Sequence, residues 1–215
     1  MSDLTHSVTL KLNALLAEAS LEPLDSFQSG LFSQYLSLLL RWNERVNLTA
    51  IRDEGGILSR HFVESIACAR ALPAEISTLL DFGSGAGFPG VPIALCRKDM
   101  TVTLAESQGK KAAFLRELVR VLGIPVILHS ERAETLGKQF ACVVLRAVDK
   151  MPLAVESAAN LVCPGGWLAP MTTNRELPGL QSVAGAQFSW QPAVSMPGGE
   201  DRVLALGRRD FSELV

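Results

Sequence analysis

The spacing of apolar residues changes near residue 73 and divides the chain into two kinds of structure. Before this point, apolar side chains recur every three or four residues, as they do from Leu31 through Trp42 to Val46. This period predicts helices with one buried face. We expect a first helix over 8–19 and a second that begins at a reciprocal cap formed by Asp25 and Gln28 and ends near 46. A turn is expected at 53–56 and a third helix over 60–72.

After residue 73, short apolar runs alternate with helical patterns, which is typical of a mostly parallel α/β sheet. Helices are expected over 91–95, 110–122 and 152–161, a turn at 163–166 and a loop near Pro178. The predicted strands are 78–82, 101–106, 124–129, 141–145 and 167–171, followed by two late strands, 188–194 and 202–206, that could pair as an antiparallel edge hairpin. The sequence thus predicts a helical part, residues 1–72, and an α/β part, residues 73–215.

A glycine-rich loop follows the first of these strands. Gly83, Gly85 and Gly87 stand between the apolar run 78–82 and the next helix. Glycines at this point permit a tight turn and leave room for a ligand close to the backbone. Strand, glycine loop and helix together place backbone N–H groups and a helix N-terminus against a nucleotide-like molecule.

The exact spacing narrows the kind of ligand. A dinucleotide loop needs G-x-G-x-x-G, but its third glycine position is Phe88, and a Walker A loop needs a Gly-Lys-Ser/Thr ending that is absent. Glu106 ends the second strand about 20 residues on, where an acid binds ribose hydroxyls. The pattern is that of enzymes using S-adenosylmethionine (SAM). Glycines kept for packing alone are the alternative, and the placement of Glu106 makes it much weaker.

Composition and charge fit a globular enzyme of the cytoplasm. The 215 residues are 48% hydrophobic and 20% charged, with a formal net charge of −2, so no overall basic field indicates nucleic acid. The four cysteines form no C-x-x-C pair, and we expect free thiols in a reducing compartment and no metal site. No signal peptide or membrane span is expected.

Ligands of open α/β sheets bind at the carboxyl ends of the strands. This rule selects the loop from Gly83 to Phe88, then Glu106, the polar segment 132–134 and Arg146, which ends the fourth strand. Pairing of Arg146 with a nearby carboxylate such as Asp149 is the alternative interpretation of that residue.

Motifs at these positions also carry a family resemblance. The chain resembles the RsmG (GidB) family of bacterial 16S rRNA guanine-N7 methyltransferases. The matching residues are Asn47-Leu48-Thr49, Arg52, His61 with Ser65, the loop 83–90 that ends in Pro89-Gly90, Pro92, Glu106-Ser107, Lys110-Lys111, Phe114-Leu115, Arg132-Ala133-Glu134, Arg146-Ala147 and Pro164-Gly165-Gly166. One departure is Met171-Thr172, which stands where the family usually ends its fifth strand in Lys-Gly.

The resemblance implies a class I SAM-dependent methyltransferase, with a Rossmann-like, mostly parallel sheet, an antiparallel edge hairpin and an N-terminal helical extension. It implies SAM as methyl donor and the guanine at position 527 of 16S rRNA, in the small ribosomal subunit, as acceptor. By position, the resemblance implies these cofactor-binding residues: Gly83, Gly85, Phe88, Glu106, Ala133, Glu134 and Arg146.

The remaining expectations concern RNA and chemistry. Guanine N7 carries a lone pair and no proton, so no catalytic acid, base or nucleophile is expected, and rate comes from positioning. Arg146 is a candidate contact to RNA or cofactor, and His61 is either structural or RNA-contacting. Two other functions stay open: a SAM-dependent methyltransferase for a small molecule or protein, and a SAM-binding module without turnover. The candidate RNA-binding residues are Arg52, Arg60, His61, Arg132 and Arg202.

Overall fold

The computed structural model describes residues 2–211 and begins with helices. They are α1 (Ser2–Glu18), α2 (Ser26–Asn43), α3 (Glu54–Ile57), a π-helical segment η1 (Leu58–Val63) and α4 (Glu64–Ala71). The predicted reciprocal cap is confirmed, because the Asp25 side chain accepts from the Gln28 N–H and the Gln28 Oε1 accepts from the Asp25 N–H. The predicted turn at 53–56 is wrong: Asp53 caps a helix that starts at Glu54, six residues earlier than expected.

Within residues 2–211, nine strands form one sheet. The first five pair in parallel in the order β3-β2-β1-β4-β5, and two further strands, β8 and β9, run antiparallel to β5. β7 pairs with β8 across the turn at Pro197-Gly198-Gly199, and β6 pairs with β9. The strands are β1 (Thr78–Phe82), β2 (Thr101–Ala105), β3 (Ile127–His129), β4 (Phe140–Arg146), β5 (Val162–Thr173), β6 (Phe188–Trp190), β7 (Val194–Ser195), β8 (Arg202–Leu204) and β9 (Gly207–Arg209).

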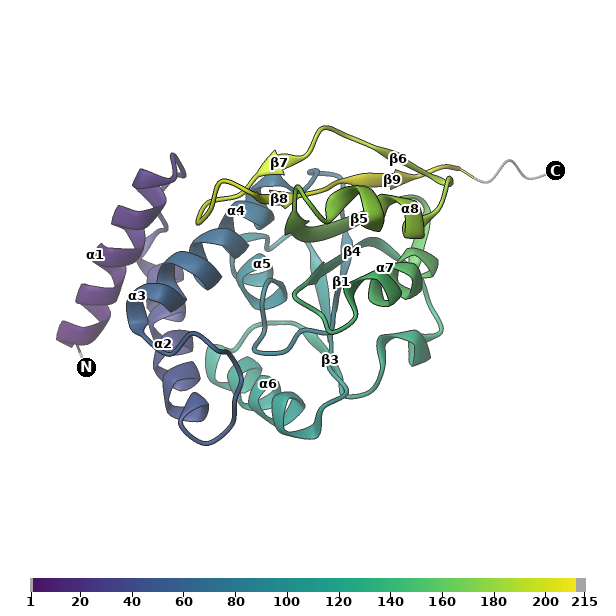
Figure 1. The fold of residues 1–215 in the computed structure, drawn as a ribbon. Helices are drawn as coiled ribbons and strands as arrows, with labels where there is room; N and C mark the ends of the chain where they lie inside the picture. The colour runs from purple at the N-terminus through teal and green to yellow at the C-terminus, as the bar shows by residue number, and fades with distance from the viewer. Residues whose placement is uncertain (1, 212–215) are drawn as a thin grey trace.

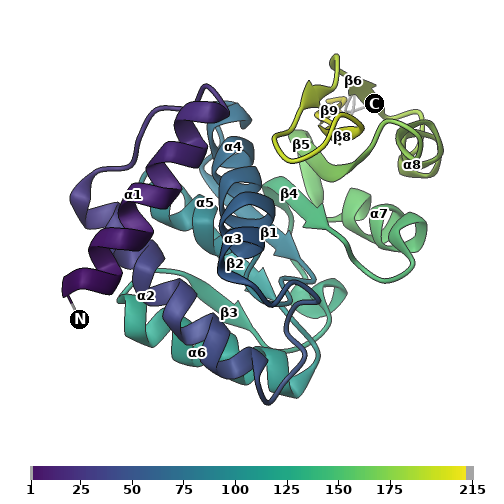
Figure 2. The ribbon, with the colours of Figure 1, turned by 60° about the vertical axis from the view of Figure 1, so that its left-hand side comes forward.

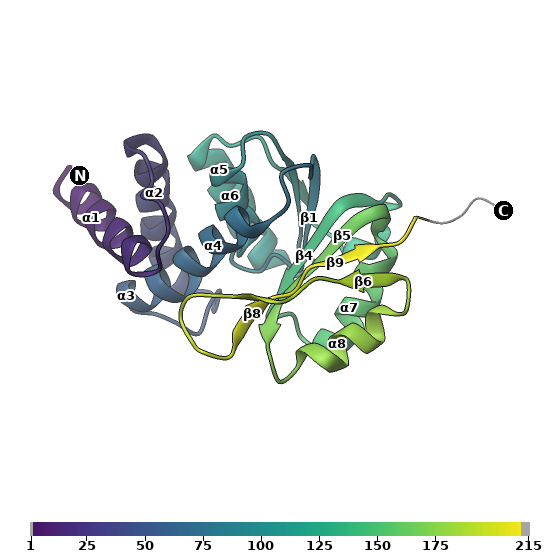
Figure 3. The same cartoon turned by 90° about the horizontal axis from the view of Figure 1, so that it is seen from above.

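Helices cover both faces of this sheet (Figures 1 and 3). On one face lie α5 (Gly90–Cys96) and α6 (Gly109–Leu122), with α4 beside α5 and with α2 packed against α5 and α6. On the other face lie α7 (Met151–Asn160) and α8 (Leu177–Ala184). A short 3-10 helix, η2 (Ala133–Leu136), follows β3. This is the predicted α/β architecture with an antiparallel edge and an N-terminal helical extension.

The sequence prediction fails in three places after β4. The segment 163–166 is not a turn, because β5 begins at Val162 and absorbs these residues beside an irregularity in its pairing with β4. Met171 therefore lies inside β5 rather than at its end. The loop expected near Pro178 is the helix α8, in which proline occupies the first turn. The two long late strands are four short ones, so only the segment around β7 and β8 forms the expected hairpin.

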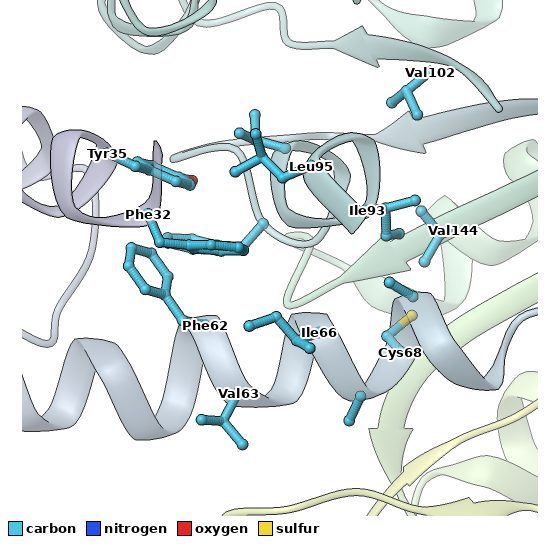
Figure 4. Close-up of a cluster of buried hydrophobic side chains, with 14 of the residues drawn as sticks. Phe32, Tyr35, Phe62, Val63, Ile66, Cys68, Ile93, Leu95, Val102 and Val144 are labelled. Carbon is cyan, nitrogen blue, oxygen red and sulfur yellow. The ribbon is translucent and has the colours of Figure 1, made fainter. Parts of the chain in front are cut away.

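The N-terminal helices share a hydrophobic core with the sheet. Phe32 and Phe62 are fully buried, and they lie in one continuous cluster with Ile93 of α5 and Val144 of β4 (Figure 4). A second buried cluster lies between the sheet and the pair α7 and α8. The helical extension is therefore packed onto the α/β part through this cluster, with α2 beside α6 and α4 beside α5 (Figure 2).

None of the helices in residues 2–211 combines the length and the apolar character that crossing a membrane requires.

Candidate functional site

A large cavity lies at the carboxyl ends of β1, β2 and β4, with a volume of about 1050 Å³. Its walls come from every segment that the strand-end rule selects, together with the loop before α3 and the start of α7. The residues that matter most below are Thr49, Arg60, His61, Gly83, Gly85, Phe88, Glu106, Ala133, Glu134, Arg146, Val148 and Arg202.

Glu106 joins the glycine loop to the end of β2. Its side chain is 6% exposed, and its Oε2 accepts from the Gly85 N–H at 2.9 Å while its Oε1 accepts from the Gln108 N–H at 2.7 Å. A carboxylate has about four acceptor sites, so two stay available toward the cavity. Gly83 has a φ of +72°, which favours glycine at the mouth of the loop. This arrangement fits a ligand with neighbouring hydroxyl groups.

An aromatic stack from the N-terminal helices supports the loop from behind. The Phe88 ring stacks on Tyr35 of α2 and on His61 of η1, with ring centroids 5.2 Å and 4.7 Å apart. The buried Tyr35 hydroxyl donates to the carbonyl of Ala86 at 2.5 Å. Sequence reasoning placed Tyr35 in the apolar stripe of its helix and missed this contact, because a helical period predicts burial of the ring but not the hydrogen-bond partner of its hydroxyl.

Tyr35→Phe is therefore expected to weaken cofactor binding while leaving the fold intact. Losing one buried hydrogen bond costs about 1 kcal/mol, or roughly fivefold in SAM affinity if the loop carries the loss. Calorimetric titration with SAM measures it. Trp42→Phe is the matched control, since it removes an indole hydrogen bond to Glu117 away from the cavity. Equal SAM affinity in both variants would contradict the supporting role of Tyr35.

Glu64 is the centre of a buried charge cluster on the rim. Its carboxylate is 1% exposed, accepts hydrogen bonds from Arg146 at 2.6 Å and Arg60 at 3.2 Å, and forms an ion pair with Arg202 at 3.1 Å. Arg146 also donates to the carbonyl of Arg60. The alternative interpretation of Arg146, pairing with a carboxylate, is thus confirmed, but the partner is not Asp149: it is Glu64, which sequence reasoning missed. Its only signal was an acid within the apolar stretch 62–67.

Three arginines around one carboxylate leave an excess of positive charge beside the cavity. Burial and the neighbouring arginines, Arg146 first, lower the pKa of His61 to about 3, so its imidazole is neutral at physiological pH. Its Nε2 lies 2.7 Å from the Thr49 hydroxyl and its Nδ1 lies 3.2 Å from Arg146. His61 is therefore held in place as a neutral ring, and its contacts are those of a structural residue that also faces the cavity.

Asp81 lies behind the loop and is fully buried. Its Oδ2 accepts from the Gly90 N–H at 3.0 Å, whereas its Oδ1 has no hydrogen-bond partner among the described residues. Burial raises the pKa of Asp81 from 3.8 to about 7, and the negative charge of Glu106 adds to the rise while the Gly90 hydrogen bond opposes it.

This shift predicts a pH-dependent stability. Between about pH 4 and pH 7 the folded protein holds a proton that the unfolded chain releases, so stability falls as pH rises through this window. Asp81→Asn removes the titration and should raise the thermal midpoint relative to the parent at about pH 8 but not at about pH 5. Thermal unfolding across this range measures the difference, and parallel curves for the two proteins would refute the assignment.

The other predicted residues divide between the cavity and its surroundings. Ala133 and Glu134 line the cavity from η2, and Arg132 lies beside them with its guanidinium on Glu134 at 2.6 Å. This contact contributes to a lowered pKa of the Glu134 carboxyl, a shift that burial opposes. Arg52 is exposed, donates to Asn47 and is not among the residues that line the cavity. Sequence reasoning also missed the lining residue Val148, which follows β4 in a loop without a motif.

The groups that line the cavity are suited to binding and orienting ligands. Within residues 2–211, no group of three or more His, Cys, Asp or Glu side chains is placed to hold a metal ion. Cys68 and Cys142 are buried free thiols, and Cys96 and Cys163 are half-buried free thiols. The cavity joins a hydroxyl-binding carboxylate, a glycine loop and a cationic rim. These features suit a nucleoside cofactor at one end and an anionic substrate at the other.

Comparisons with known proteins agree with this geometry. Residues 28–183 match the family model described as GidB, rRNA small subunit methyltransferase G. A protein named ribosomal RNA small subunit methyltransferase G from Roseiflexus sp. (strain RS-1) is 40% identical over 197 residues, which are 85% of this chain and 84% of that relative. One of the same name from Chloroflexus aggregans is 38% identical, over 86% of this chain and 83% of that relative.

Solved structures share the fold at low sequence identity. A putative O-methyltransferase from Klebsiella pneumoniae is 17% identical with a TM-score of 0.59, covering 96% of this chain and 99% of that chain. Protein PH0226 from Pyrococcus horikoshii OT3 is 15% identical with a TM-score of 0.60, covering 79% and 99%. At such identities the likeness concerns the fold alone.

Proposed function

Because the chain belongs to the rRNA small subunit methyltransferase G family, we propose that it transfers a methyl group from SAM to N7 of a guanine in 16S rRNA. The observation that carries the proposal is the pairing of a nucleoside-binding end, built on Glu106 at the end of β2, with a cationic rim built on Arg146 at the end of β4, two strands along the sheet. The guanine at position 527, within the small ribosomal subunit, is the proposed acceptor.

The residues present fit SAM. Each carboxylate oxygen of Glu106 accepts one backbone hydrogen bond and keeps a further acceptor position for ribose hydroxyls, and Gly83 and Gly85 leave the backbone of the loop open to the cavity. Ala133 and Glu134 are the proposed adenine side, while Phe88 and Arg146 are proposed for the methionine side. When bound, SAM supplies an electrophilic methyl group on a positively charged sulfur.

The chain's own residues contribute orientation rather than proton transfer. Guanine N7 needs no base, and the neutral His61 is held by Thr49 and Arg146 rather than freed to act as one. The rigid loop, fixed by Glu106 and Tyr35, holds the donor side, and the cluster around Glu64 holds the acceptor side. Bringing nucleophile and methyl carbon into line is a positioning effect.

RNA contacts are proposed along the rim. Arg60, Arg202 and Arg132 are partly or largely exposed beside the cavity, and Arg52 extends the row beyond it. His61 remains a proposed RNA contact through the edge of its ring that faces the cavity. We also propose that the chain divides into a helical subdomain, residues 1–72, and a methyltransferase domain, residues 73–215. The proposed location is the cytoplasm, where ribosomal RNA is found.

Labelled methyl transfer from SAM to small ribosomal subunits, with mapping of the modified base, tests the function. We expect transfer to one guanine N7. We also expect faster transfer to subunits than to deproteinised 16S rRNA at equal salt, because a chain of net charge −2 makes few non-specific phosphate contacts. No transfer to either would refute the function, and equal rates would refute the subunit preference alone.

A further inference from the structure

A second cavity adjoins the first. Its volume is about 320 Å³, at the lower end of the range for small-molecule sites. It lies between the ends of β4, β5 and β8. Arg146, Ala147, Val148 and Arg202 line both cavities, so the two lie side by side along the sheet.

The strand order indicates which molecule belongs there. The proposed adenine side is next to β3, the ribose carboxylate ends β2, and the glycine loop follows β1, so the proposed cofactor follows the order β3-β2-β1. The next strands in that order are β4 and β5. A methyl acceptor that approaches from the far end of the cofactor therefore meets the second cavity.

The walls of this cavity are unusually rich in thioether side chains. Of the five methionines in the chain, three line it: Met151, Met171 and Met196. Met171 and Met196 are each 6% exposed. Methionine side chains are unbranched and polarisable, and they make favourable contacts with aromatic rings. Such walls suit the faces of a flat heteroaromatic ring but do not hydrogen-bond to the polar atoms at its edges.

One carboxylate in the lining is placed to accept hydrogen bonds from the edge of such a ring. Glu176 lines the cavity just before α8, and the Thr172 hydroxyl donates to its Oε2 at 2.9 Å. The other carboxylate in the lining, Glu64, is already paired with three arginines. Glu176 is exposed, and its remaining acceptor positions are open to a molecule that enters from solvent.

We propose that the second cavity receives the flipped-out target guanine, and that Glu176 accepts hydrogen bonds from its N1–H and N2 amino groups. Enzymes that act on one base extrude it from its stack, bind it between apolar side chains and read its Watson–Crick edge. N7 lies at the opposite end of the purine, so this orientation turns N7 away from Glu176 and toward the residues shared with the cofactor cavity. The inference rests on the proposed function.

The same contact discriminates guanine from adenine, which also has an N7 lone pair. Adenine presents an acceptor at N1 and has no N2 amino group, so its N1 lone pair would face the Glu176 carboxylate. A site built to accept hydrogen bonds rejects a ligand that lacks the donors. An amide at position 176 could instead donate to adenine N1 and accept from its N6 amino group.

The test uses small subunits assembled on 16S transcripts that carry guanine or adenine at the target position. Single-turnover methyl transfer is measured for the parent, Glu176→Gln, Glu176→Ala and the control Glu156→Gln, whose exposed side chain is on α7. SAM affinity is measured for each by calorimetry. We expect both Glu176 variants to lose about 10- to 100-fold on guanine at unchanged SAM affinity. Glu176→Gln should also narrow the guanine-to-adenine ratio by about tenfold or more.

The outcomes separate the two ideas. A parent protein that transfers no methyl group to guanine subunits contradicts the proposed function, and this inference falls with it. A parent that is active, with Glu176 variants whose guanine rate and base ratio stay within twofold of it, overturns this inference alone. An equal loss in Glu156→Gln would also overturn it, because the effect would then not belong to the cavity.

Discussion

Glu64→Ala is expected to lower the free energy of unfolding by about 3–5 kcal/mol, because it leaves Arg146 buried without its counter-charge. The Arg146 side chain is 8% exposed, and burial already lowers the pKa of its guanidinium despite the opposing charge of Glu64. Arg60 and Arg202 would then add repulsion, because all three arginines meet on this one carboxylate. Urea unfolding followed by tryptophan fluorescence measures the loss.

Two further variants make this prediction specific. Glu64→Gln keeps the shape and one acceptor but not the charge, so it should fall between the parent and Glu64→Ala. Glu54→Ala removes a half-exposed ion pair with Lys11, which should cost no more than about 1 kcal/mol. Similar losses for Glu64→Ala and Glu54→Ala would show that the buried cluster contributes nothing special.

Glu106→Ala is expected to weaken SAM binding by about 10- to 150-fold, corresponding to about 1.5–3 kcal/mol. The variant loses the carboxylate oxygens proposed for the ribose. It also releases the N–H groups of Gly85 and Gln108, which Glu106 now orients. The glycine loop would become less ordered in the same step, so the whole effect should appear in affinity for SAM.

Calorimetric titration of the folded variant with SAM measures that affinity. Glu75→Ala is the matched control, since Glu75 is exposed near the amino end of β1, away from the cavity. Its affinity should equal that of the parent. If Glu106→Ala also bound SAM with parental affinity while its fold was unchanged, the cofactor would have to bind elsewhere.

Much of the fold was predictable because local sequence and buried position agree. β1 has the predicted bounds, 78–82, because Leu79, Leu80 and Phe82 are apolar and buried, as expected of a parallel strand that is covered on both faces. Gly123 ends α6 with a φ of +61°, as its position after the helical stripe predicted. The error at 163–166 came from Pro164 and two glycines, which indicate a turn locally, although they form an irregularity inside β5 between Val162 and Trp167, the residues that pair with β4.

The site was predictable where it follows from strand ends and less so where it depends on contacts across the fold. Glu106 and Arg146 follow from their positions at the ends of strands. Glu64 and Tyr35 belong to helices whose apolar period predicts burial but not the partner of a polar atom. Glu176 was hidden because the sequence predicted a loop where α8 begins.

The wide turn of η1 has a consequence for how this chain can change in length. The segment Leu58–Val63 joins α3 to α4 with π-type rather than α-type turns. In an α-helix, one residue more or less rotates everything after it by about 100°. A one-residue insertion within 58–63 would therefore swing Glu64 away from Arg146 while leaving every side chain chemically intact, whereas a one-residue deletion that restored α-type winding would keep Glu64 close to its present direction. In this segment, an insertion should disturb the charge cluster more than a substitution at its half-exposed Ser59.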